Sequence, residues 1–371
     1  MAKLSILMFY RIWTSAQFIG SKMSTNDSGY MVRKLLTPIS HYLKDDDVTE
    51  IIFNKPGVAY LKTTKGDRRE DVPDLTESNM NELLRSIAVY NQTKESSLNY
   101  FILPDGERCT VIRSPAAFKG YYGFIIRKFM SISKTLPQYV EDGAFENTKN
   151  ASFHIMTPEL IEKHLHHTDG LRIDEDDAEL LGLLYHKRYE CFFERAIALQ
   201  KNIVISGATA SGKTTFMRAV LEYMHKETRI LTIEDVHELK LENFDNKLPL
   251  IFGRGEGQLT SQQLLEACMR ATPERILLAE LRGVETWDYL QSLNTGHPGS
   301  VTSVHAGSAY KAFMRISTLA NQSEEGRALG FDVIKETVFS TIDIVVQLKH
   351  RKVTEIFYDP VFVLKKLTQN H

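Results

Sequence analysis

The pattern of apolar and polar residues changes along the chain, and the change predicts two domains. Between residues 28 and 130, short β-rich runs at 48–53, 58–62 and 109–113 surround one stretch of helical periodicity at 80–90. This mixture predicts a small α+β domain. From residue 177 to 371, strand-like apolar runs alternate with helix-like segments, beginning with a long helix at 177–200. Such alternation predicts an α/β domain whose parallel-rich sheet is covered by helices.

Two other stretches carry no strong periodic signal. Residues 131–176 contain several prolines and glycines among charged and amide side chains, which is typical of a linker with short helices. Residues 1–27 begin with a short apolar run that Arg11 interrupts. That run is too short and too polar to span a bilayer, which takes about 20 apolar residues. We interpret residues 1–27 as a flexible or misassigned tail, with a peripheral membrane contact as the alternative.

Composition and charge exclude some classes of function. The 45 basic and 47 acidic residues nearly cancel, so no global charge favours tight binding to nucleic acid phosphates. The three cysteines, Cys109, Cys191 and Cys268, lie far apart in the sequence. Their spacing fits neither a disulfide framework nor a zinc site of paired cysteines, and it favours a reducing compartment.

The strongest chemical signal begins at Gly207 and matches the phosphate-binding pattern G-x-x-x-x-G-K-[ST] in full. It lies between a predicted strand at 202–206 and a predicted helix at 214–225, which is the context that the pattern requires. Glycines allow successive N–H groups and the helix N-terminus to face phosphate. Lys213 would reach the β and γ phosphates of ATP, and the Thr214 hydroxyl would bind Mg²⁺. The predicted nucleotide-binding loop consists of Gly207, Ala208, Thr209, Ala210, Ser211, Gly212, Lys213, Thr214 and Thr215.

Two apolar runs downstream end in acidic residues. The run at 230–233 is followed by Glu234, and the run at 276–279 is followed by Glu280. Ligands of doubly wound sheets gather at the carboxyl ends of the strands, so both carboxylates are expected to face the nucleotide. We predict that Glu234 is the base that activates the attacking water and that Glu280 holds metal or water. For either cluster alone, a solvated acidic loop is the alternative.

Two histidines follow, at the ends of a predicted strand. Glycines and a proline mark a turn at His297, and residues 300–304 alternate as a strand before His305. Beside a phosphate site, such histidines can sense the γ phosphate. We predict that His305 is the sensor and that His297 is the more structural of the two. Metal binding is the alternative, but a spacing of eight residues is not a helical ligand spacing, and no third ligand is evident.

These four segments, in this order, resemble the Walker A, aspartate, Walker B and histidine boxes of the secretion ATPase superfamily. Within it, the chain is most similar to the type IV secretion hexameric ATPases, closely over about residues 200–310. The resemblance implies a RecA-like P-loop domain at 177–371 and an N-terminal domain at 28–130 that clamps the nucleotide. Ala279 and Thr272 depart from the family's usual glycine and arginine, and neither change removes a charged catalytic group.

The resemblance also implies that arginines bind the nucleotide. Arg108 and Arg113 lie in a segment similar to the family's glycine–arginine strand, and Arg127 lies in one similar to its later arginine strand. An arginine on the phosphates offsets the charge that develops in phosphoryl transfer. We prefer Arg127 as the contact, followed by Arg108, and surface salt bridges are the alternative. Arg282 also matches a family position.

The implied function is ATP hydrolysis with Mg²⁺ by a homo-hexamer that powers bacterial type IV secretion or pilus assembly. The implied place is cytoplasmic, peripherally on the inner membrane, with other secretion-channel ATPases and inner-membrane proteins as partners and nucleic acid only as possible cargo. A type II secretion or type IV pilus motor is the nearest alternative, although the former's four-cysteine zinc insertion and the latter's retraction motif have no counterpart. A DNA-processing ATPase and an inactive nucleotide-binding scaffold are further alternatives. The intact Lys213 argues against the scaffold.

Overall fold

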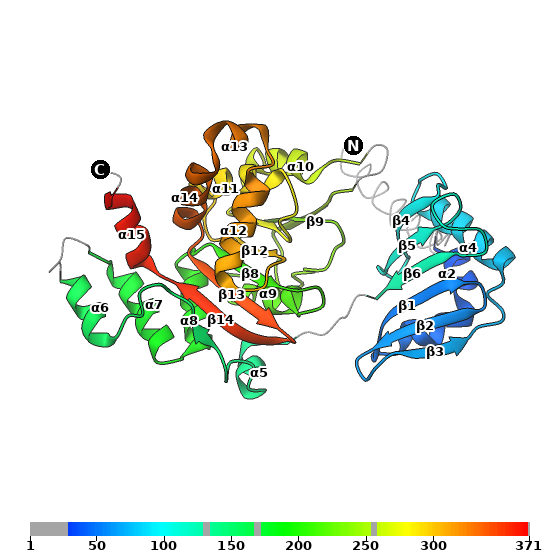
Figure 1. Cartoon of the computed structure of the whole chain (residues 1–371), viewed down its shortest axis with the longest axis horizontal. Coiled ribbons are helices and arrows are strands. Elements are labelled where there is room, and N and C mark those ends of the chain that lie inside the picture. The colour runs from blue at the N-terminus through cyan, green and yellow to red at the C-terminus, as the bar shows by residue number, and fades with distance from the viewer. Residues whose placement is uncertain (1–28, 129–133, 167–171, 254–257, 370–371) are drawn as a thin grey trace, which may run out of the picture. The chain divides into compact units, whose positions relative to one another are not determined.

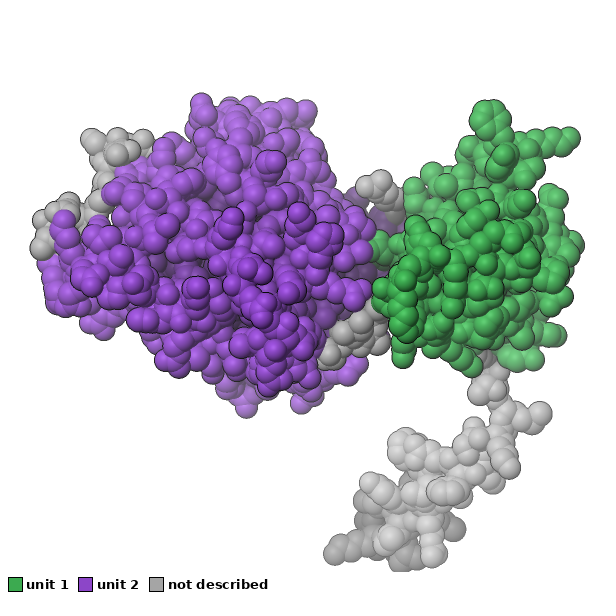
Figure 2. All heavy atoms as spheres, turned by 60° about the horizontal axis from the view of Figure 1, so that its bottom comes forward, with its two compact units in different colours: residues 1–130 green, residues 131–371 purple. Residues whose placement is uncertain are grey.

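The computed structural model describes residues 29–128, 134–166, 172–253 and 258–369 (Figure 1). The chain divides into two compact units, unit 1 at residues 1–130 and unit 2 at residues 131–371, which are coloured separately in Figure 2. Unit 1 has one apolar core, and unit 2 has two. The predicted fold class is confirmed: a smaller α+β domain precedes a parallel-rich α/β domain.

Unit 1 is a sheet packed against helices. Its six strands pair antiparallel in the order β3-β2-β1-β6-β5-β4. The main helix, α4, is capped by the Thr76 side chain and buries one face, including Leu83 and Ile87, in the core of the unit. The elements are α2 (Tyr30–Leu35), η1 (Thr37–Ile39), α3 (Ser40–Lys44), β1 (Val48–Lys55), β2 (Val58–Thr63), β3 (Arg68–Asp71), α4 (Glu77–Tyr90), β4 (Leu98–Ile102), β5 (Arg108–Ile112) and β6 (Gly123–Arg127).

The strands of unit 2 form two sheets that meet between β11 and β12. One sheet has the order β10-β9-β11 and the other β12-β8-β13-β14-β7. Every pair is parallel except β13 with β14. The strands are β7 (Lys149–Asn150), β8 (Ile203–Gly207), β9 (Ile230–Glu234), β10 (Lys247–Ile251), β11 (Arg275–Leu278), β12 (Val301–Val304), β13 (Ile344–Lys349) and β14 (Lys352–Tyr358).

Hydroxyl groups join these two sheets. Ser300, Thr302 and Ser303, all on or beside β12, donate hydrogen bonds from their side chains to carbonyls of Ile276, Leu278 and Ala279. Because β11 and β12 belong to different sheets, these hydroxyl-to-carbonyl bonds link the two strands where a main-chain ladder would otherwise do so. They fix the carboxyl end of β11 beside that of β12.

Helices cover both faces of the sheet, because residues of β8 alternate between the two cores. Ile203 and Ile205 belong to the core that contains α8 and α9, whereas Val204 belongs to the core that contains α11, α12 and α14. The helices are α5 (Leu136–Glu141), α6 (Pro158–Leu165), α7 (Glu175–Tyr185), α8 (Tyr189–Ala198), α9 (Lys213–Leu221), α10 (Ser261–Met269), α11 (Glu285–Asn294), α12 (Ala309–Ala320), α13 (Glu324–Leu329), α14 (Phe331–Thr341) and α15 (Pro360–Gln369).

Two details differ from the sequence prediction. The helix expected over 177–200 is two helices, α7 and α8, because the chain turns at Lys187, whose φ of 56° is left-handed. The segment expected as a linker with short helices does contain the short helices α5 and α6, but its strand β7 also pairs with β14, so part of the segment belongs to the sheet of unit 2.

The tail predicted at residues 1–27 lies outside the described residues. In the part of the chain that the structure describes, none of the helices combines the length and the apolarity that crossing a membrane requires.

Phe216 offers a test of the packing of unit 2. This side chain of α9 is fully buried and contacts the rings of Tyr139, Phe145 and Phe193. Phe216→Ala is expected to lower the free energy of unfolding by about 3–5 kcal/mol in a denaturant titration, because it leaves a cavity. The control Tyr185→Ala, at a side chain 44% exposed, is expected to change it by less than about 1 kcal/mol. Equal effects of the two substitutions would contradict this core.

Candidate active site

The loop between β8 and α9 is the one that the sequence predicts to hold phosphate. It contains Gly207 at the end of β8 and Gly212 at the N-cap of α9. The φ of Gly212 is 93°, a conformation that favours glycine. A Cβ atom on Gly207 would lie 2.4 Å from Ser211 Oγ and 2.7 Å from the Leu348 carbonyl oxygen, so a side chain there cannot fit without movement. Both glycines of the sequence motif are therefore required by the backbone.

Lys213, the first residue of α9, turns its amine back under this loop. Its Nζ donates to the carbonyl oxygens of Gly207 at 3.0 Å and Ala208 at 3.2 Å. The same Nζ lies 3.2 Å from Nδ1 of His305, which follows β12. The residue is only 8% exposed, so its charge depends on these polar neighbours.

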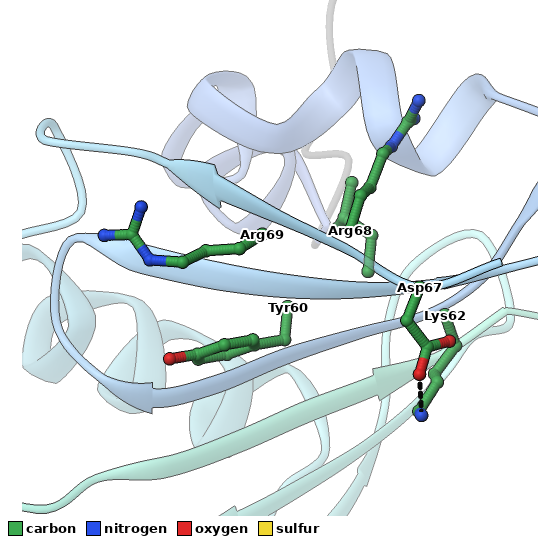
Figure 3. Close-up of a pocket in the computed structure, with 6 residues that line it drawn as sticks. Tyr60, Lys62, Asp67, Arg68 and Arg69 are labelled. Atoms are coloured by element: carbon green, nitrogen blue, oxygen red, sulfur yellow. Dashed lines mark hydrogen bonds and ion pairs between the residues drawn. The ribbon is translucent and has the colours of Figure 1, made fainter.

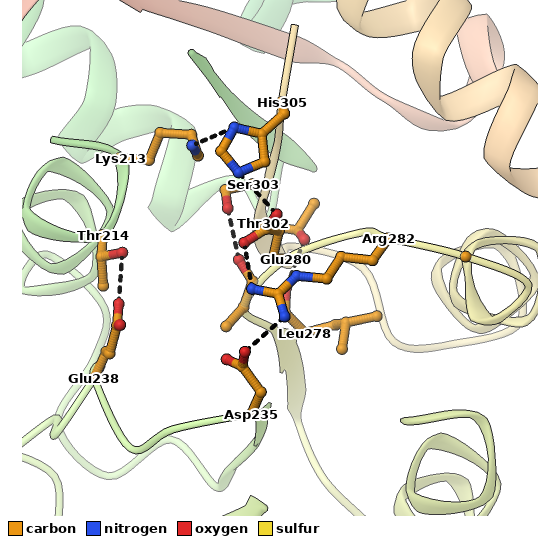
Figure 4. Close-up of polar contacts among 12 residues, drawn as sticks. Lys213, Thr214, Asp235, Glu238, Leu278, Glu280, Arg282, Thr302, Ser303 and His305 are labelled. Atoms are coloured by element: carbon orange, nitrogen blue, oxygen red, sulfur yellow. Dashed lines mark hydrogen bonds and ion pairs between the residues drawn. The ribbon is translucent and has the colours of Figure 1, made fainter. Parts of the chain in front are cut away.

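A chain of charged groups leads away from Lys213 across the carboxyl ends of three strands (Figure 4). Nε2 of His305 lies 3.1 Å from Oε1 of Glu280, which follows β11. The other oxygen of Glu280 accepts from Arg282 at 2.8 Å. Arg282 in turn donates to Asp235, which follows β9, at 2.6 Å. The parallel sheet thus collects these side chains at one edge.

These contacts control the charge of each group. Burial alone would raise the pKa of Glu280, but the hydrogen bond from Arg282 and the charges of Arg282, His305 and Lys213 hold that pKa below its usual value. Burial, followed by the charge of Lys213, lowers the pKa of His305. Burial opposes the charge of Arg282, but bonding to Glu280 and the charge of Asp235 raise the pKa of its guanidinium. At neutral pH Glu280 is therefore ionised and His305 is neutral.

Thr214 has a carboxylate partner that the sequence prediction omitted. Its hydroxyl donates to Oε2 of Glu238 at 3.0 Å (Figure 4). A threonine hydroxyl and a carboxylate are both hard oxygen ligands of the kind that Mg²⁺ prefers. Of the predicted metal ligands, the structure thus pairs Thr214 with Glu238, whereas Glu280 is bonded to Arg282 and His305.

Glu234 has a different environment from the one its predicted role suggests. It is 1% exposed. Its Oε2 accepts from the main-chain N–H groups of Glu238 and Leu239, both at 2.8 Å. Its Oε1 accepts from the Thr232 hydroxyl at 3.1 Å and lies 3.1 Å from Nδ1 of His237. In this conformation Glu234 holds the loop that presents Glu238, and its role as a base stays a prediction.

His297 is not brought to this site. It precedes β12, whereas His305 follows that strand. Since β12 runs parallel to β8, the Lys213 loop lies at the carboxyl end of the pair, and His297 lies at the amino end. A strand of four residues separates the two ends by about 13 Å. His297 therefore lies at the strand end away from the Lys213 loop, and its contact with nucleotide stays a prediction.

The three predicted arginine contacts belong to unit 1. Arg108 and Arg127 lie directly opposite each other on β5 and β6. Arg127 also makes an ion pair of 3.7 Å with Glu50. Arg113 makes one of 3.1 Å with Glu95. Contact of any of these arginines with nucleotide stays a prediction.

The sequence prediction selected Glu234 after β9 but did not select Asp235 or Glu238. The available signal was the spacing, because carboxylates one and four residues after Glu234 follow the same strand end. Their partners, Arg282 and Thr214, lie 47 and 24 residues away in sequence, so only the fold identifies the pairs.

Unit 1 also has a hollow, of about 250 Å³, beside the β2–β3 hairpin (Figure 3). Its lining residues are Tyr60, Leu61, Lys62, Asp67, Arg68 and Arg69. Each of its cations is already paired with a carboxylate: Lys62 with Asp67, Arg68 with Asp45 and Arg69 with Asp71. The hollow therefore offers less to a phosphate than the loop of unit 2.

Comparisons with known proteins find relatives over most of this chain. Residues 175–355 match the type II/IV secretion system protein family. The type IV secretion system protein VirB11 of Bartonella henselae is 35% identical over 336 residues, which cover 88% of this chain and 92% of that protein. The VirB11 ATPase from the Brucella suis type IV secretion system, solved in complex with sulphate, is 31% identical with a TM-score of 0.50 and covers 90% of this chain and 99% of that chain.

A more distant likeness extends to a pilus motor. The pilus retraction motor PilT with bound ADP has a TM-score of 0.55, covering 91% of this chain and 86% of that chain. Since the two sequences are 15% identical, the likeness shows a shared fold alone.

The bonds of Glu234 predict a structural effect. Glu234→Ala leaves the N–H groups of Glu238 and Leu239 without an acceptor and is expected to lower the free energy of unfolding by about 1–3 kcal/mol. Glu234→Gln retains an oxygen acceptor and is expected to cost less. Denaturant titration of both variants measures the difference, and equal stability of Glu234→Ala and wild type would show that these bonds do not hold the loop.

Proposed function

Because this chain belongs to the VirB11 family of type IV secretion system proteins, we propose that it is a P-loop ATPase that powers such a system. The observation that supports this most strongly is the convergence of Lys213, His305 and Glu280 at the phosphate loop, where His305 lies within hydrogen-bond distance of both Lys213 and Glu280. This arrangement combines a cation for the phosphates, a neutral polar group and an ionised carboxylate. Phosphoryl transfer requires little more than such positioning and electrostatic stabilisation.

Lys213 and the loop would bind the triphosphate. The N–H groups of the loop and the start of α9 favour negative charge, and Lys213 would exchange its carbonyl partners for phosphate oxygens. Thr214 and Glu238 would hold Mg²⁺, whose chemistry is to neutralise charge on the phosphates. Their present hydrogen bond places both oxygens where one cation can be shared.

Glu280 is the carboxylate that we assign to the attacking water. It is ionised, and its side chain is 20% exposed beside His305 and Arg282, so it can accept a hydrogen bond from water. Glu234, the base predicted from sequence, would first have to release two loop N–H groups. It stays the second candidate for this role.

His305 would report the presence of the γ phosphate. Its ring lies between Lys213 Nζ and Glu280 Oε1, and its lowered pKa keeps it neutral at pH 7, so it can donate one hydrogen bond and accept another. Movement of Lys213 toward phosphate would break the contact with His305. The histidine thereby couples occupancy of the loop to the carboxylate at β11.

The assembly is proposed from the family resemblance. We propose a homo-hexamer at the cytoplasmic side of the inner membrane, peripherally attached, which works with other secretion-channel ATPases and inner-membrane proteins. Arg127, Arg108 and Arg113 would close unit 1 over the nucleotide, and its rigid-body motion would deliver the work. Nucleic acid would take part only as cargo, in agreement with the near-zero net charge.

Lys213→Ala tests the proposed activity. Removing this amine is expected to abolish measurable ATP turnover by the full chain, because the phosphates lose their cation at the point of transfer. Turnover is measured as phosphate release, with and without single-stranded DNA. Strong stimulation of the wild type by DNA would favour a DNA-processing ATPase, and turnover by Lys213→Ala equal to wild type would contradict the site.

Conservative substitutions distinguish the proposed roles of Glu234, Glu238 and Glu280. Glu280→Gln is expected to reduce turnover about 100-fold or more while ADP still binds, because only the charge near the water is lost. Glu238→Gln is expected to raise the Mg²⁺ concentration needed for half-maximal rate. Glu234→Gln is expected to reduce turnover less than Glu280→Gln. A larger loss of turnover in Glu234→Gln than in Glu280→Gln would restore Glu234 as the base.

A further inference from the structure

The phosphate loop has a second wall that the catalytic groups do not use. In the sheet, β8 lies between β12, which leads to His305, and β13 on the other side. The register of β13 beside β8 continues to Leu348 opposite Gly207. The carboxyl end of β13 therefore reaches the same sheet edge as the phosphate loop, where ligands of such sheets bind.

Beyond that end, the chain makes a strained two-residue turn. His350 and Arg351 join β13 to β14, and their φ angles are 50° and 62°. A turn with two left-handed residues is usually made with asparagine and glycine, because other side chains pay a conformational cost there. Neither histidine nor arginine lowers this cost as glycine would, and strained backbone of this kind is common at functional sites.

Arg351 contacts the phosphate loop directly. Its main-chain N–H donates to the Ser211 carbonyl at 3.2 Å. A Cβ atom built on Gly212 would lie 3.6 Å from Cγ of Arg351 and 3.8 Å from its Cα. The stem of this side chain thus runs along the last glycine of the loop, immediately before Lys213.

The turn brings positive charge to this position. Lys349, His350, Arg351 and Lys352 are consecutive and exposed. Among the described residues, Arg351 makes no ion pair with a carboxylate. Burial raises the pKa of Tyr139, on α5, to about 12, and the positive charge of Arg351 offsets part of that rise. The side chain whose stem lies beside Gly212 therefore carries a guanidinium that forms no ion pair with the described carboxylates, so its donors can serve a ligand.

We propose that Arg351 binds the α-phosphate end of the nucleotide held by the phosphate loop. The inference rests on the proposed function and adds a residue to it. Glu280 and His305 approach the loop from the β11 and β12 side, where the γ phosphate reacts, and Arg351 approaches from the β13 side. Its ligand is therefore the part common to ATP and ADP. An arginine presents a fork of donors that matches phosphate oxygens.

Arg351→Gly separates this role from a structural one. Glycine suits the left-handed turn, so the melting temperature of the nucleotide-free variant is expected to equal or exceed that of wild type. Calorimetric titration of the full chain is expected to show affinities for ADP and for a non-hydrolysable ATP analogue that both fall about tenfold. Arg351→Lys, which keeps the charge and loses the forked pair of donors, is expected to show affinities between those of wild type and Arg351→Gly. The matched control Lys349→Ala, at the end of β13 two residues before Arg351, is expected to bind as wild type does.

Three outcomes would overturn the inference. Unchanged affinity of Arg351→Gly for both ADP and the ATP analogue would remove Arg351 from the site. Loss of affinity for the ATP analogue alone would place this side chain at the γ phosphate instead. A wild-type chain that binds neither nucleotide would overturn the proposed function as well, whereas normal wild-type binding with an unaffected variant overturns only the role of Arg351.

Discussion

The buried ammonium group of Lys213 is the constraint around which unit 2 is organised. A charge that is 8% exposed requires polar partners, and the loop supplies two main-chain carbonyls while β12 supplies His305. The carbonyls can turn inward because Gly207 and Gly212 leave room for the loop to close. A triphosphate offers this amine stronger acceptors than neutral carbonyls do, so the closed loop is arranged to exchange partners rather than to keep them.

The parallel sheet turns this local arrangement into a site. Because β8, β9, β11 and β12 run in one direction, the residues that follow them gather at one edge. The hydroxyls of β12 hold β11 in place, and the chain Lys213, His305, Glu280, Arg282 and Asp235 then crosses three strand ends. On the opposite side, the turn after β13 carries Arg351 to the same loop. A nucleotide held by this loop would therefore have charged or polar side chains near it on both sides of β8.

Much of the fold and the centre of the site were predictable from local patterns. Strand, glycine loop and helix occur together at 202–225, and an acidic residue follows each apolar strand, so Lys213, Glu234 and Glu280 could be selected as candidates from the sequence. Which partner each carboxylate contacts depends on side-chain rotamers and on pairing between residues distant in sequence. The periodicity of apolar residues does not encode either of these. The predicted base Glu234 is folded into its own loop, and Glu238 takes the position beside Thr214. The sequence placed His297 before a strand and His305 after it, but only the parallel pairing of β12 with β8 shows which of these two ends lies at the loop.

The most direct test is a crystal structure of the chain with Mg²⁺ and a non-hydrolysable ATP analogue. The account predicts that Lys213 Nζ leaves the carbonyls of Gly207 and Ala208 for the β and γ phosphates, and that the Thr214 hydroxyl turns from Glu238 alone to the shared cation. A nucleotide bound elsewhere, with the bonds of Lys213 to both carbonyls unchanged, would contradict it.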